Sequence, residues 1–68
     1  MIEVTKINGT KLLVNTGLIE TVEETPDTVI TLTDGKKIIV KESRREVKNL
    51  VKLARQEYFK EILNVEMS

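Results

Sequence analysis

The 68-residue sequence contains no cysteine, histidine or tryptophan, and it has one tyrosine and one phenylalanine. Without cysteine, the chain can form neither a disulfide nor a thiolate metal site. Without histidine, it lacks the commonest metal ligand and the commonest general base. A chain of this size buries only about 60% of the surface that it exposes when unfolded, so it usually needs a further source of stability. Self-association or binding to a partner remains as that source.

An excess of one charge and long apolar runs are also missing. Eleven basic and eleven acidic residues give a formal net charge of zero, whereas a dedicated nucleic-acid-binding domain is typically basic. No segment approaches the roughly 20 apolar residues that a membrane-spanning helix requires. Residues 1–3 have neither the basic region nor the apolar core of a signal peptide. We therefore expect a cytoplasmic protein.

Short β-type segments separated by turn signals fill residues 2–41. The clearest strand is Thr28–Thr33, which is β-branched at every position except Leu32. The turn signals are Asn8-Gly9, Asn15–Gly17, Thr25–Asp27 and Asp34-Gly35. The two dipeptides indicate tight hairpins, since both of their residue types tolerate a positive φ. We predict a five-stranded antiparallel β-meander over 2–41, either a curled sheet or a small SH3-like barrel.

A long helix is predicted to follow the strands. Ser43 is a suitable N-cap, and Glu46 completes a capping box. Apolar residues then recur at steps of three and four, which is typical of an amphipathic helix. They are Val47, Leu50, Val51, Ala54, Tyr58, Ile62 and Val65. The whole chain, residues 1–68, is thus predicted to be one α+β domain with a C-terminal helix over 43–66.

The predicted helix is longer than the predicted sheet. From Arg44 to Val65 it would measure about 33 Å, whereas a six-residue strand covers about 20 Å. The uncovered end is rich in apolar side chains, and we expect it to pack against another copy or a partner. The candidate oligomerisation residues are Tyr58, Phe59, Ile62 and Leu63.

The sequence contains little catalytic chemistry. The three glycines stand alone in turns and form no phosphate-binding loop. The acidic residues Glu20, Glu23, Glu24 and Asp27 could in principle perform acid–base chemistry, but a solvated acidic rim explains them as well. We predict no enzyme activity, no metal site and no cofactor.

Basic residues on one side of the helix give the stronger functional signal. Their spacing of three or four residues places them together. They are Arg44, Arg45, Lys48, Lys52 and Arg55. An ordinary solvated helix face is one interpretation, and a contact for an acidic partner or a phosphate backbone is the other.

An ordered series of motifs resembles the flagellar FlbD/SwrD family. The match extends over residues 2–43, and the helix after Lys48 matches only in character. Ile7 stands where the family usually has leucine. The motifs are Thr5–Gly9, Asn15, Leu18–Glu20, Glu23–Thr28, Thr31-Leu32, Gly35-Lys36 and Val40–Ser43. The proline-aspartate-threonine turn between Leu18–Glu20 and Thr31-Leu32 is the most specific of them.

This resemblance implies a cytoplasmic bacterial protein encoded among flagellar and motor genes. The family is linked to swarming motility and to flagellar power, through the stator units that generate torque. It brings no catalytic residues. The basic helix face would then contact acidic cytoplasmic surfaces of stator or basal-body components.

Two other functions remain open at this point. Residues 18–43 followed by a basic helix also resemble the first half of the LytTR type of DNA-binding domain. The second half of that domain is missing, and the neutral net charge counts against it. A purely structural oligomer within flagellar assembly is the third possibility.

Overall fold

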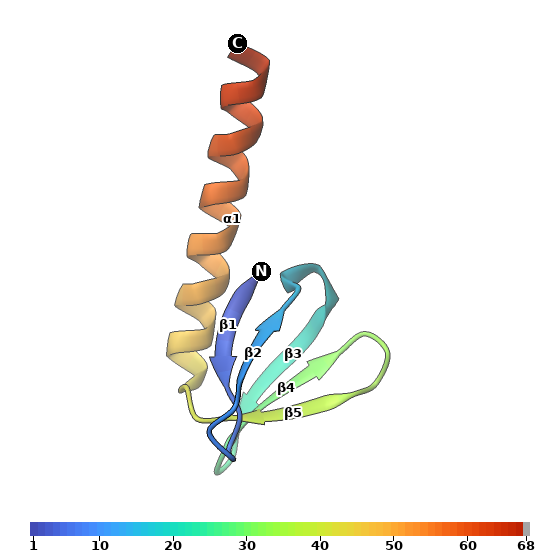
Figure 1. Cartoon of the computed structure of the whole chain (residues 1–68). Helices are drawn as coiled ribbons and strands as arrows, with labels where there is room; N and C mark the ends of the chain where they lie inside the picture. Colours follow the sequence, from blue (N-terminus) through green and yellow to red (C-terminus); the bar gives the residue numbers. More distant parts are fainter. Residues whose placement is uncertain (68) are drawn as a thin grey trace.

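The computed structural model describes the backbone of residues 1–67 and the side chains of residues 1–57. The elements in chain order are β1 (Ile2–Thr5), β2 (Lys11–Val14), the 3-10 turn η1 (Thr16–Leu18), β3 (Ile19–Glu24), β4 (Thr28–Leu32), β5 (Lys37–Val40) and α1 (Arg44–Met67). Figure 1 shows α1 standing beside the strands and extending well past them. The predicted α+β class and the C-terminal helix are confirmed.

The strands form two small antiparallel sheets. One sheet contains β1 and β2, and the other has the order β3-β4-β5. The end of β1 meets β5 through an isolated bridge between Lys6 and Val40, and Lys41 N–H donates to the Thr5 carbonyl at 2.8 Å. β2 and β3 are consecutive but unpaired. The prediction of a single five-stranded meander is therefore wrong, and the described strands form no closed barrel.

The departure from a meander begins at Asn15. Its Oδ1 accepts the Gly17 N–H at 2.9 Å, and the Leu18 N–H donates to its carbonyl at 3.0 Å. Such side-chain-to-backbone bonds compete with strand pairing. The chain therefore turns through η1 instead of folding β3 back onto β2, and the free edge of β3 is a consequence of this turn.

The two predicted hairpin turns are present, with a different internal geometry. Gly9 and Gly35 have φ values of 92° and 90°, and no other residue type has a positive φ among the residues described. Asn8 and Asp34 act through their side chains, which accept the N–H groups of Thr10 and Lys36 at 3.0 and 2.9 Å. Each hairpin loop is thus closed by an Asx-type bond followed by a left-handed glycine.

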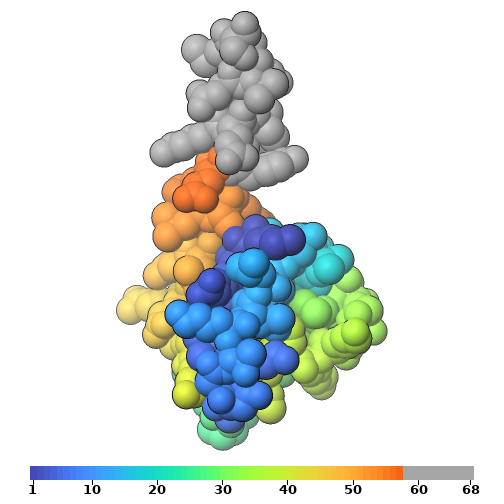
Figure 2. All heavy atoms as spheres, viewed as in Figure 1, coloured from blue at the N-terminus to red at the C-terminus, as the bar shows by residue number. Residues whose placement is uncertain are grey.

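The core lies between the two sheets and the first half of α1. It consists of small and β-branched side chains, and α1 contributes Val47, which is 0% exposed. The helix packs on β1 and β3, and Figure 2 shows the β1–β2 hairpin lying across the front of this body. The other buried apolar side chains are Ile2, Val4, Val14, Ile30 and Val40.

The predicted helix start at Ser43 is confirmed. Its Oγ accepts the Glu46 N–H at 3.1 Å and donates to the Glu46 carboxylate at 3.4 Å. Leu53, which the periodicity places off the apolar stripe, is 57% exposed. The sequence pattern therefore fixes both the beginning of α1 and the face that it turns toward the strands.

Candidate functional site

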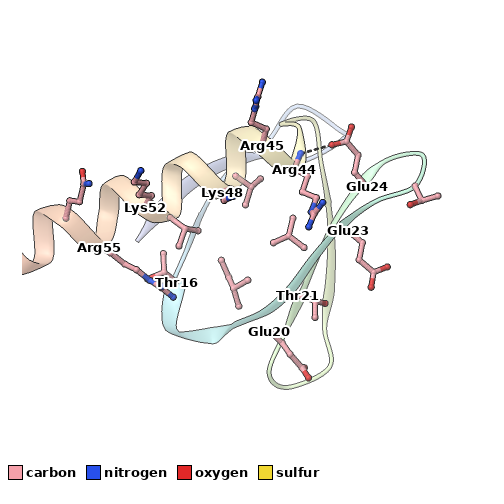
Figure 3. Close-up of a pocket in the computed structure, with 16 residues that line it drawn as sticks. Thr16, Glu20, Thr21, Glu23, Glu24, Arg44, Arg45, Lys48, Lys52 and Arg55 are labelled. Carbon is pink, nitrogen blue, oxygen red and sulfur yellow. Dashed lines mark hydrogen bonds between the residues drawn. The ribbon is translucent and has the colours of Figure 1, made fainter.

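A wide groove lies between β3 and the first half of α1 (Figure 3). Its apolar lining comes from Ile19 and Val22 of β3 and from Val47 and Val51 of α1. Its volume is about 1740 Å³, whereas pockets for small molecules typically measure about 300–1,000 Å³. The groove is therefore large enough for a segment of polypeptide.

The two walls of this groove carry opposite charges. All five basic residues predicted as a contact line the α1 wall, and all five are exposed. Glu20, Glu23 and Glu24 are exposed on β3. In Figure 3, Glu24 lies toward α1, whereas Glu20 and Glu23 point away from it. The sequence indicates each cluster separately, and the fold places them across one groove. The basic residues are Arg44, Arg45, Lys48, Lys52 and Arg55.

The basic side chains do not all point the same way. In Figure 3, Arg44 and Arg55 point into the space between α1 and β3, whereas Arg45 and Lys52 point away from it. Across the side chains that the structure describes, the one ion pair within 4 Å joins Lys11 and Glu3, at 3.5 Å. The charges of Arg44 and Arg55 are thus not neutralised by a described carboxylate, and they remain open to an acidic group.

Glu24 connects the two walls. Its Oε1 accepts the Arg44 backbone N–H at 2.7 Å, a length typical of a charge-assisted bond. The carboxylate also lies where the helix dipole favours negative charge. Ser43 and Glu24 therefore cap α1 together, and the second cap comes from 20 residues earlier in the chain. Glu24 thus has a structural role as a cap of α1.

A second carboxylate, Glu42, ties the start of α1 to β1. Its Oε1 accepts the Thr5 N–H at 2.8 Å. Partial burial raises the pKa of Glu42, but the hydrogen bonds from Thr5 and the charge of Lys11 lower it by more, so the pKa lies below its ordinary value of 4.5. Sequence reasoning missed this residue because its partner is 37 positions away.

Three further findings concern only the described residues. No group of three potential metal ligands occurs within residues 1–57. No helix in the described part of the chain combines the length and apolar character of a membrane span. The candidate oligomerisation side chains Tyr58, Phe59, Ile62 and Leu63 lie outside the side chains that the structure describes.

Comparison with known proteins gives one match. A family model described as "FlbD: Flagellar and Swarming motility proteins" matches residues 1–59. This range covers both sheets and the groove-lining part of α1. No curated protein and no solved structure matches the chain.

Proposed function

Because the chain belongs to the FlbD family of flagellar and swarming motility proteins, we propose that it is a non-enzymatic adaptor that supports flagellar motor power from the cytoplasmic side. It acts by binding a protein partner, and we expect this partner to be a stator or basal-body component. The contact is made by the basic side chains of α1 that point into the groove, Arg44 and Arg55. The observation that carries the proposal is the position of Arg44 and Arg55, exposed and aimed into a groove of polypeptide size.

The electrostatics of the groove favour a protein partner over DNA. A phosphate backbone in contact with Arg44 would also lie near the carboxylate of Glu24, which accepts the Arg44 backbone N–H. A protein segment, in contrast, can place acidic side chains toward α1 and basic ones toward β3. The neutral net charge also removes the long-range attraction on which DNA binding depends.

Paired charge reversals on α1 test this function. Arg44→Glu with Arg55→Glu reverses the two side chains that point into the groove. Arg45→Glu with Lys52→Glu is the matched control, because it changes the net charge by the same amount on the same helix but at side chains that point away. Each variant replaces the native gene in a motile strain, and folding is checked by circular dichroism of the purified protein.

We expect the groove-facing pair to produce normal numbers of flagella with weak torque on tethered cells, and reduced swarming. The strain that carries the control pair should swarm at a rate closer to that of the parent strain. Normal swarming by a folded Arg44→Glu/Arg55→Glu strain would refute the basic contact. Missing flagella in that strain would instead indicate a role in assembly or expression.

Self-association through the end of α1 is a separate proposal. It assigns the contact between copies to Tyr58, Phe59, Ile62 and Leu63, on the basis of their apolar sequence pattern. Truncation after Arg55 should convert the oligomer to a monomer, measured by light scattering coupled to gel filtration. An unchanged oligomeric state would eliminate this assignment.

A further inference from the structure

The edge of β3 that borders the groove is unpaired. β3 is the outermost strand of its sheet, with β4 on one side and no strand of the described chain on the other. Exposed edges of this kind present a row of backbone N–H and C=O groups that can pair with another strand. The free edge of β3 therefore offers backbone hydrogen bonds in addition to the charges of the groove.

The register identifies which backbone groups are free. Leu32 N–H donates to the Lys36 carbonyl at 2.8 Å, and antiparallel pairs alternate between bonded and non-bonded positions. Thr31 and Val29 of β4 therefore bond toward β3, where their partners are Thr21 and Glu23. The backbone groups of Val22 and Glu24, between these positions, point toward the free edge.

The charges around this edge specify what can pair with it. Residues on an added strand alternate between its two faces. On the α1 side they would meet the apolar lining and the unneutralised Arg44 and Arg55. On the opposite side they would meet Glu23, which is exposed. The added strand should therefore carry carboxylate or apolar side chains on the side that faces α1. It should carry basic side chains on the side that faces Glu23.

A second copy of β3 does not meet this specification. Antiparallel pairing of two β3 edges would place Glu20 and Glu23 of one copy near the same residues of the other, and like charges across a strand pair are destabilising. The register shift between Ile19 and Thr21 further interrupts the edge, and bulges and charges both discourage self-pairing of edges.

We propose that the groove binds an extended segment of a partner protein, which adds as a strand to the free edge of β3 and alternates acidic or apolar residues with basic ones. This inference rests on the proposed function, since it names the form and chemistry of the partner at the same site. The backbone pairing supplies affinity, and the charged walls set the register and direction.

A proline at position 22 tests the backbone pairing. Val22→Pro removes the N–H that points to the free edge and leaves the N–H groups of Thr21 and Glu23, which bond to β4; proline is tolerated on edge strands in this orientation. Val22→Ala is the matched control, because it shortens the same side chain but keeps the N–H. Swarming should fall to the level of a gene-deletion strain with Val22→Pro and fall clearly less with Val22→Ala, and the difference between the two variants reports the N–H.

The outcomes separate the two proposals. Normal swarming with folded Val22→Pro, together with failure of Arg44→Glu/Arg55→Glu, would overturn strand pairing and leave the proposed function standing. Normal swarming of both variants would overturn both proposals.

A second measurement uses the unaltered full chain, so it does not depend on folding of the proline variant. The probe is a synthetic peptide of about eight residues, blocked at both ends, in which valine and glutamate alternate with lysine and threonine. Amide hydrogen exchange is followed by NMR. At millimolar peptide, exchange should slow at Val22 and Glu24 while Thr21 and Glu23, already bonded to β4, change little.

Methylation of the peptide backbone at the nitrogens that face β3 should weaken its binding by about tenfold or more. Failure to protect the Val22 amide at millimolar peptide would overturn the assignment. Protection of Val22 and Glu24 that appears without peptide and increases with protein concentration would also overturn it, because a second copy would then be the occupant.

Discussion

Shortening Val47 to alanine should destabilise the fold by about 2 kcal/mol. Val47 is 0% exposed and sits where α1 meets the buried side chains of the strands. Removing two methyl groups costs about 1.6 kcal/mol in transfer free energy, and an unfilled cavity of about 50 Å³ adds about 1.2 kcal/mol. The better helix propensity of alanine returns about 0.6 kcal/mol.

This loss is large for a domain of this size. Sixty-eight residues correspond to a total stability of about 3 to 10 kcal/mol, and each 1 kcal/mol shifts Tm by about 4–8 °C in small domains. We therefore expect Val47→Ala to lower Tm by about 8–16 °C. The assay is thermal and urea unfolding followed by far-ultraviolet circular dichroism.

Leu53→Ala on the same helix is the control. It removes more apolar volume, but Leu53 is 57% exposed, so its effect should stay within about 0.5 kcal/mol. Equal losses of Tm in the two variants would refute the packing of α1 described above, because the exposed and the buried side of the helix would then be energetically alike.

Three further predictions concern single residues. Glu24→Ala should cost about 1 kcal/mol and speed amide hydrogen exchange at Arg44; unchanged exchange would mean that the cap is not formed in solution. Glu42→Gln should lower stability at neutral pH. Because the folded-state pKa of Glu42 is lowered, its contribution is present above the ordinary value of 4.5 and is lost as the pH falls through the folded-state pKa. The difference between parent and Glu42→Gln in urea unfolding should therefore shrink on acidification, and a constant difference would contradict this. Gly35→Ala, at a φ of 90°, should lower the urea midpoint by the equivalent of about 1 kcal/mol, and an unchanged midpoint would contradict the left-handed turn.

Local signals in the sequence predicted the elements but not their arrangement. The cap at Ser43 and the hairpins at Gly9 and Gly35 depend on residues a few positions apart, so they can be read directly from the sequence. The bridge from Lys6 to Val40 spans most of the strand region, and no local pattern encodes it. The turn at Asn15–Gly17 was predicted from its residue types, but the sequence does not show that the Asn15 side-chain bond to Gly17 leaves β2 and β3 unpaired.

The candidate site was predicted in halves. The sequence shows the spacing of the basic residues in α1 and the clustering of acidic residues in β3. It does not show that the two elements border one groove, because that depends on how α1 packs against the strands. The alternation of residues in β3 does not identify its buried face, because the register shift between Ile19 and Thr21 changes the parity of the strand. Ile19 and Val22 are both half-buried as a result.

The anchoring of α1 also gives the molecule a mechanical property. The helix is held at its first turn by Ser43 and Glu24, and its 24 residues extend about 36 Å from that point. A tilt of α1 by about 10° about its first turn would move the other end by about 6 Å. Because the first half of α1 packs on β1 and β3, a small change in that packing when a strand enters the groove would be converted into a much larger displacement at the far end of α1.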